Sequence, residues 1–295
     1  MSTPELAVVI VSYRTRDVLR DCLASIMRAR QAVSFEVWVV DNASGDGTVE
    51  MVAAEFPQVH LVASPTNDGF ARANNRVLRE VRSDYVLLLN PDTVVLDDAF
   101  TRPIEFLRRT PRAGMVTCRL VKRDGTLDLA CRRAFPTPFD GFCRAAGLSR
   151  LFPRSPRFAR YNLTYLDEML PARVDAVNGA FMLVRREAMA EVGLLDEDYF
   201  MYMEDLDWCF RFATHGWHVY YDPSAVVVHL KGESGKQSSE AMIRAFFVSM
   251  EIFHRKHLAT RQPRLAALAT RAGIRAWMYA TLARNALRGA KRVTP

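Results

Sequence analysis

The first ninety residues alternate short apolar runs with amphipathic stretches, and this order constrains the fold more than any other feature. The apolar runs cover residues 7–11, 35–40, 59–63 and 85–89, and helical periodicity fills residues 16–29, 48–56 and 71–81 between them. A strand followed by a helix and another strand implies a crossover, which makes the strands parallel and gathers their carboxyl ends at one edge. The pattern predicts an α/β fold with a mostly parallel sheet and flanking helices.

The alternation becomes irregular after a strand predicted at residues 114–120. Residues 131–171 are rich in Pro, Arg and aromatic side chains without clear periodicity, and we expect them to form a loop region over the site. Order returns with a predicted strand at 179–184, a helix at 204–214 and a strand at 225–228.

Positive charge is concentrated at the end of the chain. The formal net charge is +7, but ten Lys or Arg and no acid follow Glu251, which leaves 30 basic and 33 acidic residues in positions 1–251. We predict a basic helical C-terminal extension over residues 241–295 that rests on an anionic membrane surface. A helical tail that packs on the domain is the alternative. No nucleic-acid-binding motif occurs, so a nucleic-acid partner is not expected, and nothing in the pattern indicates an oligomeric state.

Cysteine usage and the N-terminus indicate a cytoplasmic location. The five cysteines are odd in number and form no C-x-x-C pair, which argues against a disulfide framework and a zinc site. The first apolar stretch is short and has no basic region before it, unlike a signal peptide. No uncharged apolar stretch reaches the roughly 18 residues of a spanning helix. We therefore expect a protein of the cytoplasm that is peripheral on the inner face of the cell membrane.

Several common enzyme classes are excluded by the turn after the first strand. Residues 12–16 contain no glycine, so the dinucleotide-binding fingerprint G-x-G-x-x-G is absent. The phosphate loop G-x-x-x-x-G-K-[ST] and the hydrolase elbow G-x-S-x-G are absent as well. A dehydrogenase, a P-loop enzyme and a serine hydrolase are not expected.

Polar residues follow each predicted parallel strand, where ligands of open α/β sheets bind. They are Ser12 and Tyr13, Asp41, Asn67 with Gly69 and Asn74, and Asn90 with Asp92. A carboxylate at Asp41 would accept the N3–H of uracil or thymine, and Gly69 would allow close approach of the backbone. Asp92 is placed to hold a metal or a phosphate. Each group alone is also typical of an ordinary turn.

Residues 196–208 mix acids with large aromatic and thioether side chains, a composition that suits a sugar site. A partly desolvated carboxylate there would have a raised pKa, as a general base requires. The acids could instead complement the dipole of a helix start. His229 ends an apolar strand, where a lone histidine is often structural. A histidine and a carboxylate on one sheet edge could also share a divalent cation with phosphate oxygens.

Five motifs taken in order resemble the inverting family-two glycosyltransferases, and among them most closely the bacterial rhamnosyltransferases. The motifs are VVDNASGDGT (39–48), NDGFA (67–71), LLNPD (88–92), EDLDW (204–208) and HLKGES (229–234). The resemblance runs from Val8 to Ser234. It implies a GT-A fold with a Rossmann-like sheet over residues 1–240, a nucleotide-binding half at 1–120, an acceptor half at 121–240, and the basic extension at 241–295.

The resemblance also implies roles for individual residues. It makes Asp41 a nucleobase contact, Asn67 and Gly69 part of the nucleotide pocket, Asp92 a metal-binding acid, His229 a further metal ligand, Asp205 the catalytic base and Glu204 its support. The implied cofactor is Mg²⁺ or Mn²⁺. The sequence departs from the common D-x-D motif at Asn90, which brings less charge to the cation than an aspartate would.

The implied reaction is a single in-line displacement that inverts the anomeric configuration. The resemblance points to L-rhamnose from dTDP-rhamnose as donor and a hydroxyl of a polyprenyl-diphosphate-linked saccharide as acceptor, in cell-wall or surface polysaccharide synthesis. Two alternatives stay open. One is transfer of galactofuranose or a hexose from a UDP donor to a lipid or polysaccharide, and the other is a catalytically silent, membrane-associated relative.

Overall fold

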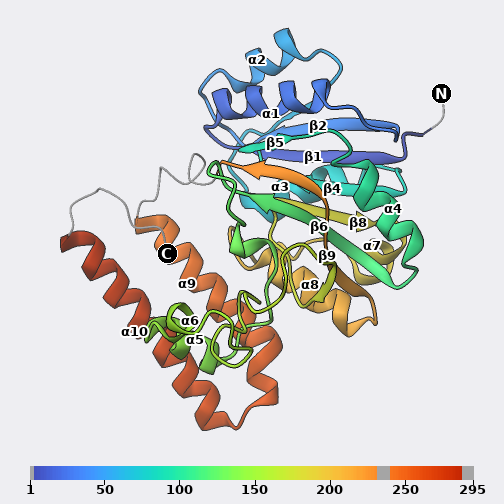
Figure 1. Ribbon diagram of the computed structural model, residues 1–295. Coiled ribbons are helices and arrows are strands. Elements are labelled where there is room, and N and C mark those ends of the chain that lie inside the picture. Colours follow the sequence, from blue (N-terminus) through green and yellow to red (C-terminus); the bar gives the residue numbers. More distant parts are fainter. Residues whose placement is uncertain (1–2, 231–239, 288–295) are drawn as a thin grey trace.

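The computed structural model describes residues 3–230 and 240–287, which form a nine-stranded sheet flanked by helices (Figure 1). The strands are β1 (Leu6–Ser12), β2 (Phe35–Asp41), β3 (His60–Ala63), β4 (Tyr85–Leu89), β5 (Thr93–Val95), β6 (Ala113–Val121), β7 (Ala172–Val174), β8 (Phe181–Arg185) and β9 (His218–His229). The helices are α1 (Arg16–Arg28), α2 (Thr48–Glu55), α3 (Gly69–Leu78), α4 (Thr101–Arg109), α5 (Pro138–Ala145), α6 (Leu148–Leu151), α7 (Arg186–Val192), α8 (Glu204–Thr214), α9 (Glu240–Phe253) and α10 (Arg264–Leu287).

The first half of the sheet is parallel, as the alternating pattern predicted. The strands run in the order β3-β2-β1-β4, and every residue of β4 is buried. Buried parallel strands need apolar side chains on both faces, which explains their continuous apolar sequences. Ser12 lies opposite Asp41, and Ile10 lies opposite Leu89. The polar residues that end β1 and β2 and follow β4 therefore share one edge of the sheet.

The second half of the sheet is mixed. β8 lies antiparallel between β4 and β6, β6 pairs with β9 in parallel, and β5 and β7 pair antiparallel with β9. The three-residue strand β5 places Thr93 opposite His229. The backbone N–H of Leu230 also donates to the Asp92 carbonyl at 2.8 Å. This pairing holds the end of β9 beside the segment that follows β4.

Residues 131–171, expected to be loop, contain the short helices α5 and α6. Helix α5 starts with a capping box, in which the Asp140 N–H donates to Thr137 Oγ1 and Asp140 Oδ2 accepts from the Thr137 N–H. Pro138 occupies the first turn, where its missing N–H is not needed. Helices of eight and four residues are too short for apolar periodicity to reveal them.

Helices α9 and α10 lie side by side beside the sheet (Figure 1). Ile243, Phe247 and Ile274 form a small core between them. Glu251 of α9 pairs with Arg271 and Arg275 of α10. Helix α10 therefore packs on α9, and the ion pairs with Glu251 offset part of the positive charge of the C-terminal extension.

The turn between these helices is anchored to the rest of the protein by charged contacts. Lys256 pairs with Asp196 at 2.5 Å, and the His257 ring lies 2.5 Å from the buried Asp207 carboxylate. Within residues 3–230 and 240–287, no helix combines the length and the apolar character that crossing a membrane requires.

Candidate active site

Asp41 is the last residue of β2, and only one of its two carboxylate oxygens has a hydrogen-bond partner. Its Oδ2 accepts from the Ser44 N–H at 3.1 Å, whereas Oδ1 is buried and has no hydrogen-bond partner. A buried polar oxygen without a partner is unfavourable, so Oδ1 is suited to accept a hydrogen bond from a ligand. Beside it, Ser12 Oγ lies 3.0 Å from Thr15 Oγ1, and the half-buried Tyr13 ring packs under Arg14.

Asn67 builds the loop before α3 rather than presenting its side-chain oxygen to the site. Asn67 Oδ1 accepts from Asn42 Nδ2 at 2.8 Å and from the Gly69 N–H at 3.1 Å. Asn74 donates to the Phe70 carbonyl, but its Oδ1 is buried without a partner. Among the amides predicted from this segment, Asn74 is therefore the one with an acceptor to offer.

Contacts within the protein require a glycine at position 69. Its φ is +81°, and an added Cβ would lie 2.2 Å from the carbonyl oxygen of Phe200. The Phe70 N–H donates to that same oxygen at 2.8 Å. The close backbone approach predicted at this glycine exists, but its neighbour is the 196–203 loop rather than a ligand. Gly69 thus joins the nucleotide-side loop to the segment that leads into Glu204.

Asp92 and His229 meet at the carboxyl edge of the sheet. Asp92 Oδ1 lies 3.4 Å from His229 Nε2, and both side chains are buried. The contact is long, and Oδ1 has no partner with hydrogen-bond geometry. Asn90, which precedes this pair, is half-buried, and its backbone N–H donates to the Ala180 carbonyl.

A second carboxylate orients His229 from the opposite side. Asp128 Oδ2 lies 3.0 Å from His229 Nδ1, so the ring is held between two acids. Burial alone would lower the pKa of His229, but the hydrogen bond to Asp128 and the negative charges of Asp128 and Asp92 outweigh it and raise the pKa to about 9. In this state the imidazole carries a positive charge between the carboxylates.

Asp92 and His229 suit a divalent cation. No three His, Cys, Asp or Glu side chains in the described part of the chain are grouped to hold a metal on their own. However, Asp92 Oδ1 is buried and unpartnered beside an imidazole nitrogen, and Mg²⁺ and Mn²⁺ accept a carboxylate oxygen and an imidazole nitrogen that has released its proton, together with phosphate oxygens and water. Asp128 would then act on the second nitrogen of His229, as outer partners of metal-bound histidines commonly do.

Asp205, in the first turn of α8, is held by a buried arginine. Its Oδ2 accepts from an Arg133 Nη at 2.6 Å, and its Oδ1 accepts from the Leu206 N–H at 2.7 Å. Arg133 donates to the Val177 carbonyl as well. A carboxylate oxygen can accept a second hydrogen bond, so Asp205 keeps the capacity to receive a proton from a hydroxyl group. Its orientation is fixed before any substrate arrives.

The buried carboxyl group of Glu204 has a raised pKa. Burial, reinforced by the negative charge of Asp205, raises its pKa above the ordinary value. Glu204 Oε2 is buried and has no hydrogen-bond partner. The two preceding residues, Tyr202 and Met203, both have positive φ, a strained arrangement that is common at functional sites. The raised pKa expected in this segment therefore belongs to Glu204.

Two short segments connect these groups. Asp128 and Arg133, which contact His229 and Asp205 respectively, are five residues apart and flank a 3₁₀ turn at Leu129–Cys131. In the other segment, the carbonyls of Val177 and Ala180 accept from Arg133 and from the Asn90 backbone. Sequence reasoning missed both Asp128 and Arg133. The available signal was an Arg-Arg pair at the start of the loop predicted to cover the site.

We expect the Glu204→Gln variant to gain stability relative to the wild type as pH rises. The folded protein binds the Glu204 proton more tightly than the unfolded chain, so this contribution is complete below the ordinary pKa of 4.5 and is lost as pH rises through the raised pKa. Glutamine cannot ionise, so the variant avoids that loss. Urea unfolding at several pH values from 5 to 9 measures the difference, with exposed Glu187→Gln as control. A difference independent of pH would contradict the expectation.

Comparisons with known proteins agree with this architecture. A family model described as glycosyltransferase-like family 2 matches residues 4–247. The N-acetylglucosaminyl-diphospho-decaprenol L-rhamnosyltransferase of Mycobacterium tuberculosis is 32% identical over 262 residues, which cover 85% of this chain and 84% of that protein.

Two solved structures share the fold at lower identity. The mannosyltransferase PcManGT of Pyrobaculum calidifontis, in complex with GDP-Man and Mn²⁺, has a TM-score of 0.58 at 20% identity and covers 98% of this chain and 77% of its own. GalNAc-T7 with UDP, GalNAc and Mn²⁺ has a TM-score of 0.58 at 15% identity and covers 86% of this chain and 48% of its own. The chain therefore belongs to the family 2 glycosyltransferases and has a GT-A fold.

Proposed function

We propose that the chain transfers L-rhamnose from dTDP-rhamnose to a hydroxyl of a polyprenyl-diphosphate-linked saccharide. The observation that carries this proposal is the identity of 32% to the mycobacterial rhamnosyltransferase, which extends over most of both chains. Residues 1–240 would form the catalytic domain, with the nucleotide bound by 1–120 and the acceptor by 121–240. Residues 241–295 would form the extension.

The free acceptors at the sheet edge support a nucleotide site. Asp41 Oδ1 would accept the N3–H of thymine, because it is buried and lacks a partner. Asn74 Oδ1 offers a second buried acceptor. Around them the pocket for the nucleotide and its sugar would be completed by Ser12, Tyr13, Asn67, Gly69, Asn90 and Asp92.

Asp205 would act as the catalytic base. It would take the proton of the acceptor hydroxyl, whose oxygen then attacks the anomeric carbon from the face opposite the diphosphate and inverts its configuration. The contact with Arg133 keeps the carboxylate in one orientation, which reduces the entropy lost on reaching the transition state. Glu204, whose pKa is raised by burial, would stay protonated and donate a hydrogen bond to the acceptor or to Asp205.

Asp92 and His229 would hold the divalent cation, Mg²⁺ or Mn²⁺. When bound, such an ion neutralises the charge that develops on the leaving diphosphate, an effect worth several kcal/mol. The protein would act at the inner face of the membrane, with the arginines of the extension that are not paired within the hairpin facing anionic lipid. The hexapeptide HLKGES continues beyond His229 with Gly232 and Ser234, which lie outside the described residues.

A matrix of donors and acceptors tests the proposal. We expect purified protein to transfer rhamnose from dTDP-rhamnose to N-acetylglucosaminyl-diphospho-polyprenol, as read by mass spectrometry. Chelation should abolish transfer and Mn²⁺ or Mg²⁺ should restore it, because Asp92 and His229 alone do not neutralise a diphosphate. Transfer from a UDP-hexose or UDP-galactofuranose instead would overturn the donor assignment. Transfer from no donor, together with full cellular function of Asp205→Asn, would indicate a silent relative.

A further inference from the structure

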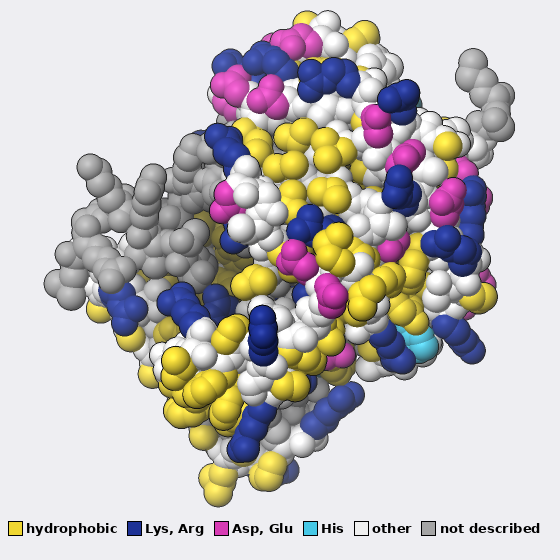
Figure 2. All heavy atoms as spheres, in the orientation of Figure 1, with side chains coloured by type: hydrophobic (Ala, Val, Ile, Leu, Met, Phe, Trp, Pro, Cys, Tyr) yellow, Lys and Arg dark blue, Asp and Glu magenta, His cyan; other side chains and the backbone are white. Residues whose placement is uncertain are grey.

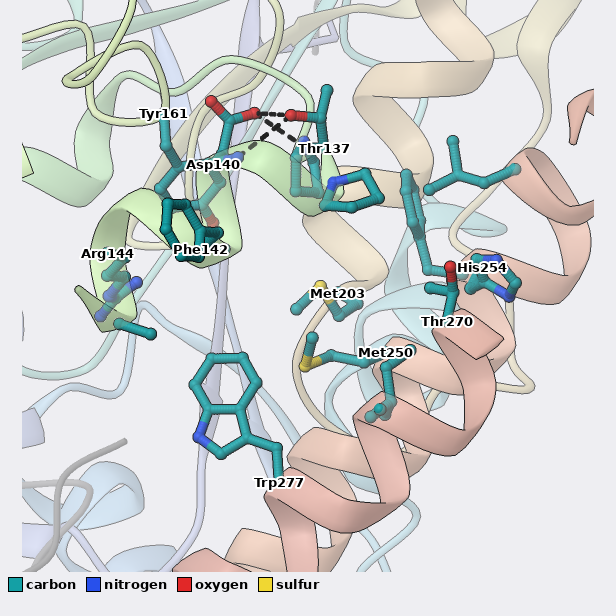
Figure 3. Close-up of a pocket in the computed structure, with 18 of the residues that line it drawn as sticks. Thr137, Asp140, Phe142, Arg144, Tyr161, Met203, Met250, His254, Thr270 and Trp277 are labelled. Carbon is teal, nitrogen blue, oxygen red and sulfur yellow. Dashed lines mark hydrogen bonds between the residues drawn. The ribbon is translucent and has the colours of Figure 1, made fainter. Parts of the chain in front are cut away.

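A mostly apolar cavity lies between α5, α9 and α10. Its volume is about 420 Å³, within the range of roughly 300–1,000 Å³ found for pockets that bind small molecules. Figure 3 shows Met203, Met250 and Trp277 projecting into this space from three different segments, with Phe142 of α5 on the other side. The Trp277 ring packs edge-on against Phe247, with ring centroids 5.5 Å apart, which holds the indole at the cavity wall.

The cavity borders the candidate acceptor site. Met203, which lines it, is the residue directly before Glu204 and Asp205. The acid in the cavity wall, Asp140, is neutralised, because it accepts from Thr137 and pairs with Arg160 at 2.8 Å. A ligand in this cavity therefore meets a mostly apolar surface, and one wall of the cavity is formed by the residue that leads into the Glu204–Asp205 turn.

The segment that forms one side of this cavity is rich in arginine. Residues 141–160 carry Arg144, Arg150, Arg154, Arg157 and Arg160 and contain no acidic residue. Arg144 itself lines the cavity (Figure 3). Figure 2 shows hydrophobic side chains gathered at the lower left, where Figure 1 places α5 and α6, with Lys and Arg side chains around them. The exposed apolar side chains of this region include Phe139, Phe142, Leu151 and Phe152.

We infer that this cavity binds the isoprenoid chain of the acceptor lipid close to its diphosphate. The inference rests on the proposed function and adds the place where the lipid is recognised. An apolar chain fits the cavity, and a diphosphate complements Arg144 in the cavity wall and the arginine-rich segment that follows it, since guanidinium groups bind phosphate through paired hydrogen bonds. Arg160 already pairs with Asp140. The remaining charge pattern matches an anionic lipid, whereas a neutral apolar partner would give Arg144, Arg150, Arg154 and Arg157 no counter-charge.

Binding of farnesyl diphosphate to the full-length protein tests the inference without requiring turnover. Calorimetric titration should show that Phe142→Ala and Trp277→Ala weaken binding of this probe at least about tenfold. Phe142 is 59% exposed and Trp277 46% exposed, so both variants should keep the wild-type thermal midpoint. Phe152→Ala and Tyr279→Ala are matched controls, because these rings are exposed nearby but do not line the cavity. Inorganic diphosphate serves as the probe for the head group alone.

The possible outcomes distinguish lipid binding in the cavity from the transfer reaction. Equal effects of the cavity and control variants, or an affinity for inorganic diphosphate that matches that for farnesyl diphosphate, would overturn the inference. In transfer assays the cavity variants should raise the KM for a long-chain acceptor and leave the KM for dTDP-rhamnose unchanged. If the cavity variants lose farnesyl diphosphate binding but the wild type transfers to no lipid-linked acceptor, the proposed function fails and the binding site stands.

Discussion

Asp205→Asn should lower kcat about 10²-fold to 10⁴-fold, with little change in the KM for the sugar nucleotide. That range is typical for loss of a positioned general base. Asparagine keeps an oxygen for the Arg133 guanidinium, which now donates to Asp205 at 2.6 Å, but it cannot take a proton from a hydroxyl group. The substitution therefore removes proton transfer while it leaves the local packing in place. Single-turnover rates at saturating donor measure the effect on the chemical step.

Asp205→Ala and Glu204→Gln serve as comparisons for this prediction. Alanine would leave Arg133 buried without its partner, and breaking a buried ion pair in this way costs about 3–5 kcal/mol, so the alanine variant should lose stability as well as activity. Glu204→Gln keeps a neutral hydrogen-bonding group where burial already raises the pKa of Glu204, so it should lose less activity. An Asp205→Asn enzyme with wild-type turnover would exclude Asp205 as the base.

The parallel half of the sheet could be predicted because each of its strands has a recognisable pattern within its own few residues. Strands β1, β2 and β4 are mainly apolar on both faces, and each ends in a polar residue or is followed by one, so the apolar runs located the strands and the polar residues located the edge. Asp92 and His229 were predicted on this edge, and the structure places them 3.4 Å apart. The strand β5, which brings them together, has only three residues and carries no periodic signal.

The two residues that sequence reasoning missed contact partners that lie far away along the sequence. Arg133 reaches Asp205 over 72 positions, and Asp128 reaches His229 over 101 positions. Neither pairing follows from spacing or propensity, because each depends on how the antiparallel strands fold back across the sheet. The raised pKa predicted for the 196–208 segment is confirmed, but the sequence did not indicate which carboxyl group carries it. Burial and neighbouring charge, which raise the pKa of Glu204, are set by tertiary structure and do not follow from the local sequence.

Gly69→Ala should both destabilise the protein and disable it. The new Cβ would lie 2.2 Å from Phe200 O and 2.8 Å from Phe200 Cδ2, far inside contact distance, and backbone cannot move aside as a flexible side chain can. Steric overlap together with the positive φ should lower the free energy of unfolding by more than about 3 kcal/mol. Relief of the clash must displace Phe200, four residues before Glu204. A displacement of about 1 Å at catalytic groups lowers turnover about 10²-fold.

Gly45→Ala separates the clash from the backbone strain. Gly45 has a φ of +63°, comparable to the +81° of Gly69, but an added Cβ there would meet nothing within 4 Å. Its substitution should therefore lower stability by only the roughly 1–2 kcal/mol of a left-handed conformation and leave kcat close to wild type. Urea unfolding and steady-state rates on both variants provide the comparison. Similar losses in the two variants would mean that contact between the Gly69 loop and the 196–203 loop does not position Glu204 and Asp205.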